Sequence, residues 1–417
     1  LSEFLVRACA PYRDERFTTA LEMRLALEAI DTLLEPEPAV APNDLSPALR
    51  DLLANAPPNV NPIVHRFLAL SSQARRTNRG TRGIDDLTEA TYVETRLDSE
   101  LHRSVLDGRH RLVIVTGNAG DGKTAFIQQV EHSARRNNAR VVAETPNGMH
   151  LHYLGREIRT LYDGSQDEDD RTSDEVLREF LGPFAKGAGP DGSIRLAAIN
   201  EGRLRDFLLT HRDSFKYLVE GVIGTLDDPA SHYFDNDVVV VNLNARSVTA
   251  GGANSIFSQQ LQKIVSGPFW SPCQSCDHRT RCPIKHNVDT FRDPTSGPAA
   301  TERLRTLVDL IRLRRRRHLT MRDVRSLISH LLFRDRSCEE VSELLADESP
   351  LAIVDLAYFQ AVGGIGVPAG SILERGAALL AEVDLALVAN PDDDRAIARG
   401  SGPRVMAFPE RSAAGFM

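Results

Sequence analysis

Four short apolar runs stand out in the middle of the chain. They are RLVIVT (111–116), RVVAET (140–145), IRLAAI (194–199) and DVVVVNL (237–243). Their short length and many β-branched residues are typical of buried parallel strands. Helical patterns at 123–136 and 203–211, together with a helical, acidic insertion before the third run, separate them. Strands that alternate with helices predict an α/β fold whose parallel sheet is sandwiched by helices.

The regions outside this alternation are expected to be mostly helical. The stretch FTTALEMRLALEAIDTLL has an apolar face with Thr18 or Thr19 near its start, whereas the proline-rich EPEPAVAPNDLSP cannot continue a helix. We therefore expect N-terminal helices (1–35), a linker and helical connector (36–88), the α/β core (89–266), a Cys-rich insertion (267–300), a helical lid with a basic stretch (301–345) and a helical C-terminal segment (346–417).

The composition changes this picture little. With 417 residues, 41% hydrophobic and 26% charged, the chain resembles a globular protein of several domains. No apolar run approaches the roughly 20 residues of a membrane span, and no secretory signal precedes the five cysteines. We therefore expect a cytoplasmic protein without a membrane partner. A net charge of −8 argues against a surface built as a whole to wrap nucleic acid. Because the chain opens at Leu1, we expect it to be the middle of a longer protein.

The most specific motif is GNAGDGKT, which satisfies G-x-x-x-x-G-K-[ST] between an apolar strand and a helix. In this P-loop pattern the glycines let backbone N–H groups surround phosphates, Lys123 places its charge at the β and γ oxygens, and Thr124 offers a hydroxyl to Mg²⁺. The alternative is that a glycine-containing turn precedes the helix by chance and binds no phosphate. The residues expected to bind ATP are Gly117, Asn118, Ala119, Gly120, Asp121, Gly122, Lys123, Thr124 and Ala125.

Hydrolysis requires an acidic group at the end of a neighbouring strand. Glu201 is the candidate, and Asn200 stands where a metal-facing Asp is usual, so turnover is expected to be slow or Mg²⁺ to be held through water. The alternative is a helix-capping Asn-Glu-Gly turn. After the next strand, Asn242 and Asn244 are candidates to position water, against an Asn-rich turn.

Two charge runs and a helix start complete the candidates. RRRRHLTMRDVRSL begins a helix with Thr320 at its N-cap, and Arg322 is our preferred residue for sensing the γ-phosphate, against a solvated basic helix. The run 312–318 is expected to meet nucleic acid, to reach a neighbouring subunit or to form a solvated helix face. The acidic run 163–175 is expected to be a solvated insertion rather than a Mg²⁺ or Ca²⁺ site.

The segment CQSCDHRTRCPIKHN holds a candidate structural zinc site. Three thiolates and an imidazole, from Cys273, Cys276, Cys282 and His286, suffice for tetrahedral Zn²⁺. His278 is the weaker fourth ligand, and an iron–sulfur site or uncoordinated thiols are the alternatives. Cys9 and Cys338 are expected to be ordinary packed or surface cysteines.

Two resemblances follow from these residues. FLVRACAPYRDERFTTALEMRLALEAI resembles the last two helices of a eukaryotic-like serine/threonine protein kinase, with Arg16 matching an arginine that closes the C-lobe. The kinase glycine loop and both catalytic aspartates are absent, so the resemblance implies a remnant in residues 1–35 without kinase activity. The rest of that kinase is expected to precede it in cis.

The second resemblance covers most of residues 90–400. LVIVTGNAGDGKTAF, AAINEGRL, VVNLNAR, CxxCxxxxxCPI and LTMRDVRSL, in that order, resemble bacterial P-loop ATPases of AAA+/STAND type. These include the ATPase of phosphorothioation-dependent restriction systems and ATPase regions fused behind kinases in antiphage defence loci. The resemblance implies an ATP-hydrolysing switch or motor in defence against foreign DNA, with DNA and a homo-oligomer as expected partners. The alternatives are a nucleotide-gated scaffold with little hydrolysis and a DNA-binding module.

Overall fold

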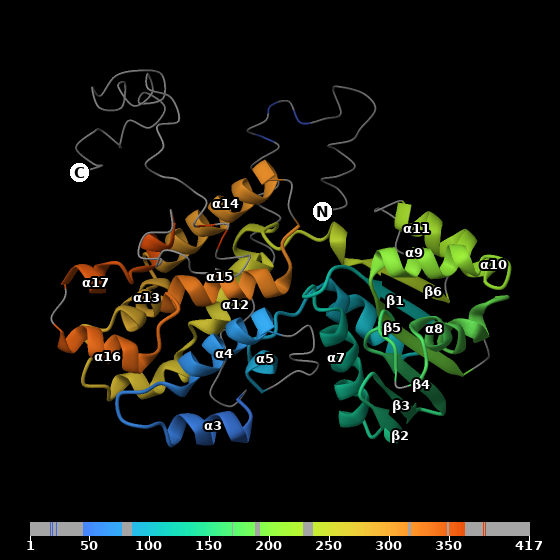
Figure 1. The fold of residues 1–417 in the computed structure, drawn as a ribbon, viewed down its shortest axis with the longest axis horizontal. Coiled ribbons are helices and arrows are strands. Elements are labelled where there is room, and N and C mark those ends of the chain that lie inside the picture. The colour runs from blue at the N-terminus through green and yellow to red at the C-terminus, as the bar shows by residue number, and fades with distance from the viewer. Residues whose placement is uncertain are drawn as a thin grey trace.

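A computed structural model describes residues 45–76, 86–168, 170–187, 192–227, 237–315, 318–347 and 350–362, together with the single residues Phe17, Thr19, Glu22, Ala378 and Leu380. The chain forms an α/β lobe and a helical lobe that lie side by side (Figure 1). Of the expected N-terminal helices, the described part shows the Glu22 backbone N–H donating to Thr19 Oγ1 at 3.0 Å. Arg16 and Cys9 lie outside the described residues.

The α/β lobe is built on one six-stranded sheet with the order β2-β3-β4-β5-β1-β6. The strands are β1 (Leu112–Thr116), β2 (Arg140–Thr145), β3 (Gly148–Tyr153), β4 (Arg156–Leu161), β5 (Ser193–Ile199) and β6 (Val238–Asn242). All four predicted strands are present. β4, β5, β1 and β6 run parallel, which confirms the parallel α/β layer.

The sequence interpretation was wrong for the region between β2 and β5. Part of the expected helical insertion forms β3 and β4, which pair with each other antiparallel, and β2 joins β3 antiparallel as an exposed edge strand. The β3–β4 turn holds Leu154 at φ 49° and Gly155 at φ 76°. The glycine tolerates this left-handed backbone readily, so the chain reverses there and the half-buried residues on either side pair as strands.

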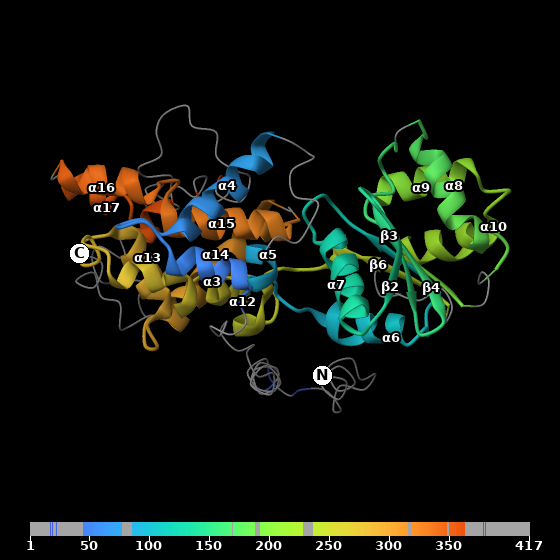
Figure 2. The same cartoon turned by 90° about the horizontal axis from the view of Figure 1, so that it is seen from below.

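Helices cover both faces of the sheet. The helical segments of this lobe are η3 (Leu97–His102), α6 (Arg103–Leu106), α7 (Lys123–Arg136), α8 (Ser173–Leu181), η4 (Gly182–Phe184), α9 (Glu201–Thr210), α10 (Lys216–Leu218), η5 (Val219–Ile223), α11 (Gly224–Asp227) and η6 (Leu243–Ala245). Because successive side chains of a strand point to opposite faces, Ile114 packs with α8 and α9 while Val113 packs with α7. Figure 2 shows α7 on one side of the sheet and α8 to α10 on the other.

The helical lobe gathers segments from both sides of the α/β lobe in the sequence. Its elements are α3 (Pro47–Ala54), α4 (Pro62–Arg76), α5 (Asp86–Ala90), η7 (Gly252–Asn254), α12 (Ile256–Ile264), η8 (Gly267–Gln274), α13 (Pro283–Arg292), α14 (Gly297–Arg315), α15 (Met321–Phe333), α16 (Cys338–Ala346), α17 (Pro350–Val354) and η9 (Tyr358–Ala361). The expected connector helices α3 and α4 therefore belong to this lobe.

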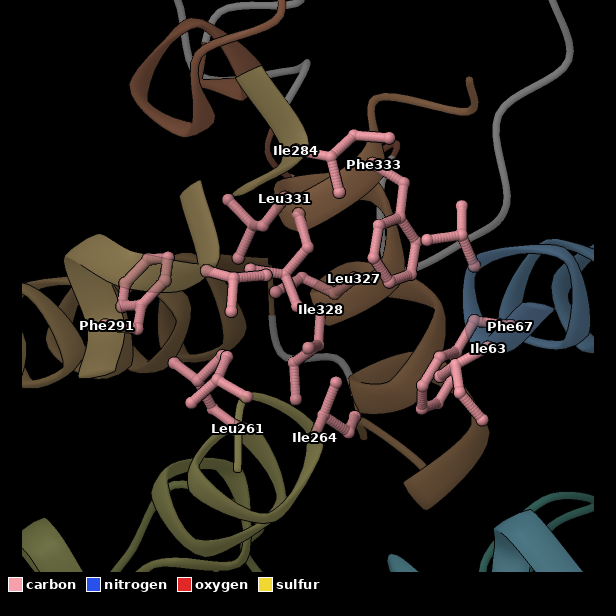
Figure 3. Packing of buried hydrophobic residues seen from close by; sticks show 14 of the residues in the cluster. Ile63, Phe67, Leu261, Ile264, Ile284, Phe291, Leu327, Ile328, Leu331 and Phe333 are labelled. Atoms are coloured by element: carbon pink, nitrogen blue, oxygen red, sulfur yellow. The ribbon is translucent and has the colours of Figure 1, made fainter. Parts of the chain in front are cut away.

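α15 forms the centre of the helical lobe. Its Leu327, Ile328 and Leu331 are at most 2% exposed and pack with Ile63 of α4 and Phe291 of α13 (Figure 3). Phe269 and Trp270, which precede the cysteines in the Cys-rich segment, are buried in the same cluster. Burying a side chain of this size contributes about 1.5–3 kcal/mol. The Cys-rich segment is thus part of a large shared core. In the described part of the chain, no helix is long and apolar enough to span a membrane.

Candidate functional site

The loop that joins β1 to α7, residues 117–124, is called the glycine loop below. Gly120 and Gly122 have φ values of 94° and 90°, a left-handed conformation that side chains with a Cβ resist. Gly122 is also the N-cap of α7. Turns of this kind bring backbone N–H groups to one concave side, and the N-terminus of a helix adds its partial positive charge. The local backbone therefore has the features of an anion-binding loop.

The two polar side chains at the start of α7 fold back on nearby carbonyl groups. Lys123 Nζ donates to Gly117 O at 2.9 Å and to Asn118 O at 2.8 Å, and Thr124 Oγ1 donates to Tyr162 O at 3.0 Å. Burial lowers the pKa of Lys123, although the carboxylates of Asp121 and Asp163 oppose this shift. Arg322 lowers the pKa further. Among the described residues, no carboxylate lies at hydrogen-bond distance from this ammonium group, which is therefore suited to receive an anion.

Strand register places the other predicted residues beside the glycine loop. Thr116, the last residue of β1, is level with Ile199 of β5 on one side and Asn242 of β6 on the other. Because these three strands are parallel, their carboxyl ends meet at one edge of the sheet. Glu201 comes two residues after Ile199, so it lies at the same edge as the loop.

Glu201, Asn242 and Asn244 form a hydrogen-bonded group, called the amide cluster below. Glu201 Oε2 accepts from both Asn242 Nδ2 and Asn244 Nδ2, each at 3.0 Å, and Oε1 accepts from Arg205 Nε at 3.1 Å. Asn242 Oδ1 in turn accepts the Asn244 backbone N–H at 3.0 Å. The structure therefore brings together three predicted catalytic residues that lie on two separate strand ends. Their contacts fix the orientation of one carboxylate.

Asn200 has a different role from its neighbour. Its side-chain oxygen accepts the Gly202 backbone N–H at 2.9 Å, which caps the N-terminus of α9. The capping interpretation of the Asn-Glu-Gly turn thus describes Asn200, whereas the carboxylate of Glu201 is in the amide cluster.

The N-terminus of α15 docks on the glycine loop from the helical lobe. The Arg322 backbone N–H donates to Gly120 O at 3.2 Å, and a Cβ placed on Gly120 would lie 2.8 Å from Arg322 Cβ. A capping box between Thr320 and Asp323 fixes this end of the helix. Arg322, the residue predicted to sense the γ-phosphate, is therefore next to the glycine loop within the same chain.

Asp121 connects the loop to both lobes. Its carboxylate is fully buried, accepts the Asn118 backbone N–H at 2.6 Å and lies 2.7 Å from His318 Nε2. Its carbonyl accepts Arg246 Nη2 at 2.5 Å. Sequence reasoning gave His318 no role, and the basic run that it ends offered no signal of this contact. The pairing depends on how α15 packs against the α/β lobe.

Asp163 is a second residue whose place the sequence concealed. It follows β4 at the same sheet edge, one residue after the carbonyl that receives the Thr124 hydroxyl, and it interacts with the Lys123 charge. Its backbone is held by Asn147, whose Oδ1 accepts the Asp163 N–H at 2.9 Å. We predicted a solvated acidic run because β4 was not recognised. Because β4 runs parallel to β5, their carboxyl ends meet at the same sheet edge, and Asp163 lies there just after β4.

The predicted zinc ligands lie far from this loop, in the helical lobe. Cys273, Cys276 and Cys282 line one pocket there, and so does Cys338. His286 is exposed on α13 and is not among the residues that line the pocket. Burial raises the pKa of Cys273 to about 11 and that of Cys338 to about 12. Among the described residues, no three His, Cys, Asp or Glu side chains already converge in a metal-binding arrangement.

In the described part of the two charge runs, the side chains have local partners. Arg312 is paired with Asp309 of the same helix at 2.9 Å, and Arg316 and Arg317 lie outside the described residues. In the acidic run, Glu175 belongs to the capping box of α8 and so has a local structural role.

Comparison with known proteins gave no match to a family model, to a curated protein or to a solved structure.

Proposed function

We propose that this chain binds ATP at the glycine loop and hydrolyses it with Mg²⁺, as a P-loop ATPase that acts as a nucleotide-driven switch or motor. The observation that carries the proposal is the meeting of three features at one sheet edge. A left-handed glycine loop at a helix N-terminus, a lysine without a direct carboxylate partner and a carboxylate held by two amides lie at the ends of β1, β5 and β6.

The side chains around the loop fit a polyphosphate. Lys123 would exchange its two loop carbonyls for β- and γ-phosphate oxygens, and the N-terminus of α7 would face the same anion. Arg322, whose Nε lies 3.5 Å from a Cβ placed on Gly120, would add a second positive charge over the loop. The negative phosphate oxygens would stabilise the charged form of Lys123 and so offset the burial that lowers its pKa.

Residues that could bind the metal and position the attacking water lie at the same sheet edge as the glycine loop. Mg²⁺ would be held by the Thr124 hydroxyl and by oxygens of the nucleotide, and it would neutralise developing charge on the phosphate. Asp163, whose charge acts on Lys123, would be the carboxylate that faces the ion. Asp163 then supplies the negative charge that the amide of Asn200 lacks. Glu201 would accept a proton from water, and Asn242 and Asn244 would keep its carboxylate oriented.

The docking of α15 favours a second version of the same function, a nucleotide-gated module with little hydrolysis. The start of α15 contacts the glycine loop through Arg322 and His318, while its later residues form the centre of the helical core. A ligand that displaces these contacts would shift α15 and hence the helical lobe. Loop occupancy alone would then produce an output.

We place this activity in bacterial defence against foreign DNA because of the motif order described above, and that context is a proposal as well. DNA and a second copy of the chain are the partners it implies. A DNA-binding module as the main function is less supported, since Arg312 is paired with Asp309.

The substitution Lys123→Ala tests nucleotide binding. Loss of charge-assisted hydrogen bonds, each worth about 1.5–3 kcal/mol, is expected to weaken ATP binding by about tenfold or more and to abolish turnover. Lys216→Ala is the matched control, because Lys216 is 80% exposed on α10 and far from the glycine loop in the sequence. Calorimetric titration with ATP and a phosphate-release assay measure both variants. Equal affinity and turnover in Lys123→Ala and wild type would refute the site.

Glu201→Gln separates a motor from a switch. Removing a general base is expected to lower kcat by about 10²–10⁴-fold while ATP binding persists. Glu220→Gln is the control, since Glu220 is 65% exposed and pairs with Lys216. If an ATP-dependent change in the helical lobe survives in Glu201→Gln, occupancy suffices. If the change is lost with hydrolysis, the motor interpretation holds. Unchanged kcat would remove Glu201 from the mechanism.

A further inference from the structure

One pocket in the helical lobe gathers the four described cysteines. Cys273 and Cys276 come from η8 and the turn after it, Cys282 is the N-cap of α13, and Cys338 is the first residue of α16. We call this the cysteine pocket. None of the four forms a disulfide. Three chain segments thus place thiol groups around one space.

Hydrogen-bond donors already contact two of the sulfur atoms. The Asn61 backbone N–H donates to Cys338 Sγ at 3.4 Å, and Asn61 Nδ2 donates to Cys273 Sγ at 3.5 Å, so one residue bridges two cysteines distant in the sequence. Donors of this kind are the outer-shell partners that orient metal-bound thiolates.

The other residues that line the pocket favour a soft cation. The lining contains no aspartate or glutamate, so hard cations that require carboxylate oxygen have no ligands here. Lys285 and Arg279 also line it and supply positive charge. A divalent ion with four thiolates carries two net negative charges. Arg279 would offset part of this charge, and Lys285, which already pairs with Asp289 of the same helix, would contribute less.

The pocket is also the size of a single ion. Its volume of about 20 Å³ accommodates one body about the size of a water molecule.

The histidines fit less well than Cys338 as the fourth ligand. His286, the ligand expected from the sequence, is exposed and does not line the pocket. His278 does line it, but its Nε2 is 2.9 Å from Ser342 Oγ.

We propose that Cys273, Cys276, Cys282 and Cys338 together bind one structural Zn²⁺ ion. The four thiols line the pocket without yet converging, so they must turn about their Cα–Cβ bonds to reach a common ion at about 2.3 Å. The ion would tie the start of α16 to the η8–α13 segment. The turn before α4 joins the same region, because Asn59 Oδ1 accepts the Asp277 N–H at 2.8 Å. The site therefore stabilises the helical lobe and is independent of the proposed ATPase.

The test uses metal analysis of the full chain purified without chelator. Wild type is expected to hold about one equivalent of Zn²⁺ and Cys338→Ser less than about half of one, while His286→Ala and His278→Ala retain it. Cys9→Ser is the matched control, because Cys9 is the one cysteine outside the proposed set. Retention of a full equivalent by Cys338→Ser together with its loss in His286→Ala or His278→Ala would overturn the four-cysteine assignment.

A spectrum of the wild-type protein tests the four-cysteine ligand set without a substitution that could prevent folding. Exchange of Zn²⁺ for Co²⁺ is expected to give the visible bands and the strong sulfur-to-cobalt absorption of a tetrahedral site with four thiolates, unchanged in His286→Ala. A spectrum of three thiolates and one imidazole would refute the role of Cys338. Stoichiometric iron with sulfide in anaerobically purified protein, or no metal at all, would refute the zinc site itself.

Discussion

The contact between Gly120 and α15 makes the substitution Gly120→Ala a sharp test of how the two lobes meet. At φ 94°, an alanine at this position costs about 1–2 kcal/mol in backbone strain. Its Cβ would lie 2.8 Å from Arg322 Cβ and 3.2 Å from Thr320 Oγ1, so the start of α15 must move away.

The movement adds a second, separable loss of stability. Overpacking of this kind costs about 1–3 kcal/mol, and the hydrogen bond from Arg322 N to Gly120 O, now 3.2 Å, would be stretched or lost. We expect Gly120→Ala to lower the free energy of unfolding by about 2–5 kcal/mol in all.

Gly155→Ala supplies the matched control. Gly155 has φ 76°, but apart from its two chain neighbours no described residue has an atom within 4 Å of a Cβ placed there. This variant therefore measures backbone strain without a clash and should lose about 1–2 kcal/mol. Urea titration without nucleotide, followed by far-UV circular dichroism, gives both values. The fluorescence of Trp270, the one tryptophan in the chain, reports on the helical lobe in the same experiment. A Gly120→Ala loss no larger than that of Gly155→Ala would refute the tight docking of α15 on the loop.

Three further predictions test neighbouring residues. Asp163→Asn should raise the Mg²⁺ concentration needed for half-maximal turnover by about tenfold, and an unchanged Mg²⁺ dependence in a phosphate-release assay would exclude this carboxylate from the metal site. Asn244→Ala removes one of two amides that orient Glu201, so kcat should fall about tenfold with little change in KM, whereas a rise in KM alone would point to substrate binding instead. Burial raises the pKa of Glu131, so the folded state holds this proton more tightly than the unfolded state. The contribution of Glu131 to the free energy of unfolding is therefore fully present below the ordinary pKa of 4.5 and declines as the pH rises. The urea midpoint of Glu131→Gln relative to that of wild type should therefore be higher at about pH 8 than at about pH 5. A relative midpoint that falls between these pH values would contradict the raised pKa.

The apolar runs predicted β1, β5 and β6 correctly because each is buried on both faces. β1 and β5 are buried along their whole length, so their residues had to be apolar whatever surrounds them. β3 and β4 were missed because they form a half-buried hairpin, whose mixed polar and apolar positions resemble an amphipathic helix over so short a length. That miss also concealed Asp163.

By itself the sequence determined the glycine loop, the helix that follows it and the strand ends at Glu201 and Asn242, because loop conformation and strand burial depend on nearby residues. Only the tertiary structure decided that Asn244 completes the amide cluster around Glu201, that Arg322 and His318 reach the loop, and that Cys338 joins the other cysteines. These contacts join segments that are separate in the chain. The Asn244 contact forms because β5 and β6 both pair with β1, and the contacts of Arg322, His318 and Cys338 form because α15 and α16 pack in a core shared with helices that precede the sheet. A spacing rule within one segment cannot contain such contacts, since which distant side chains meet is set by how the two lobes bury their apolar surfaces.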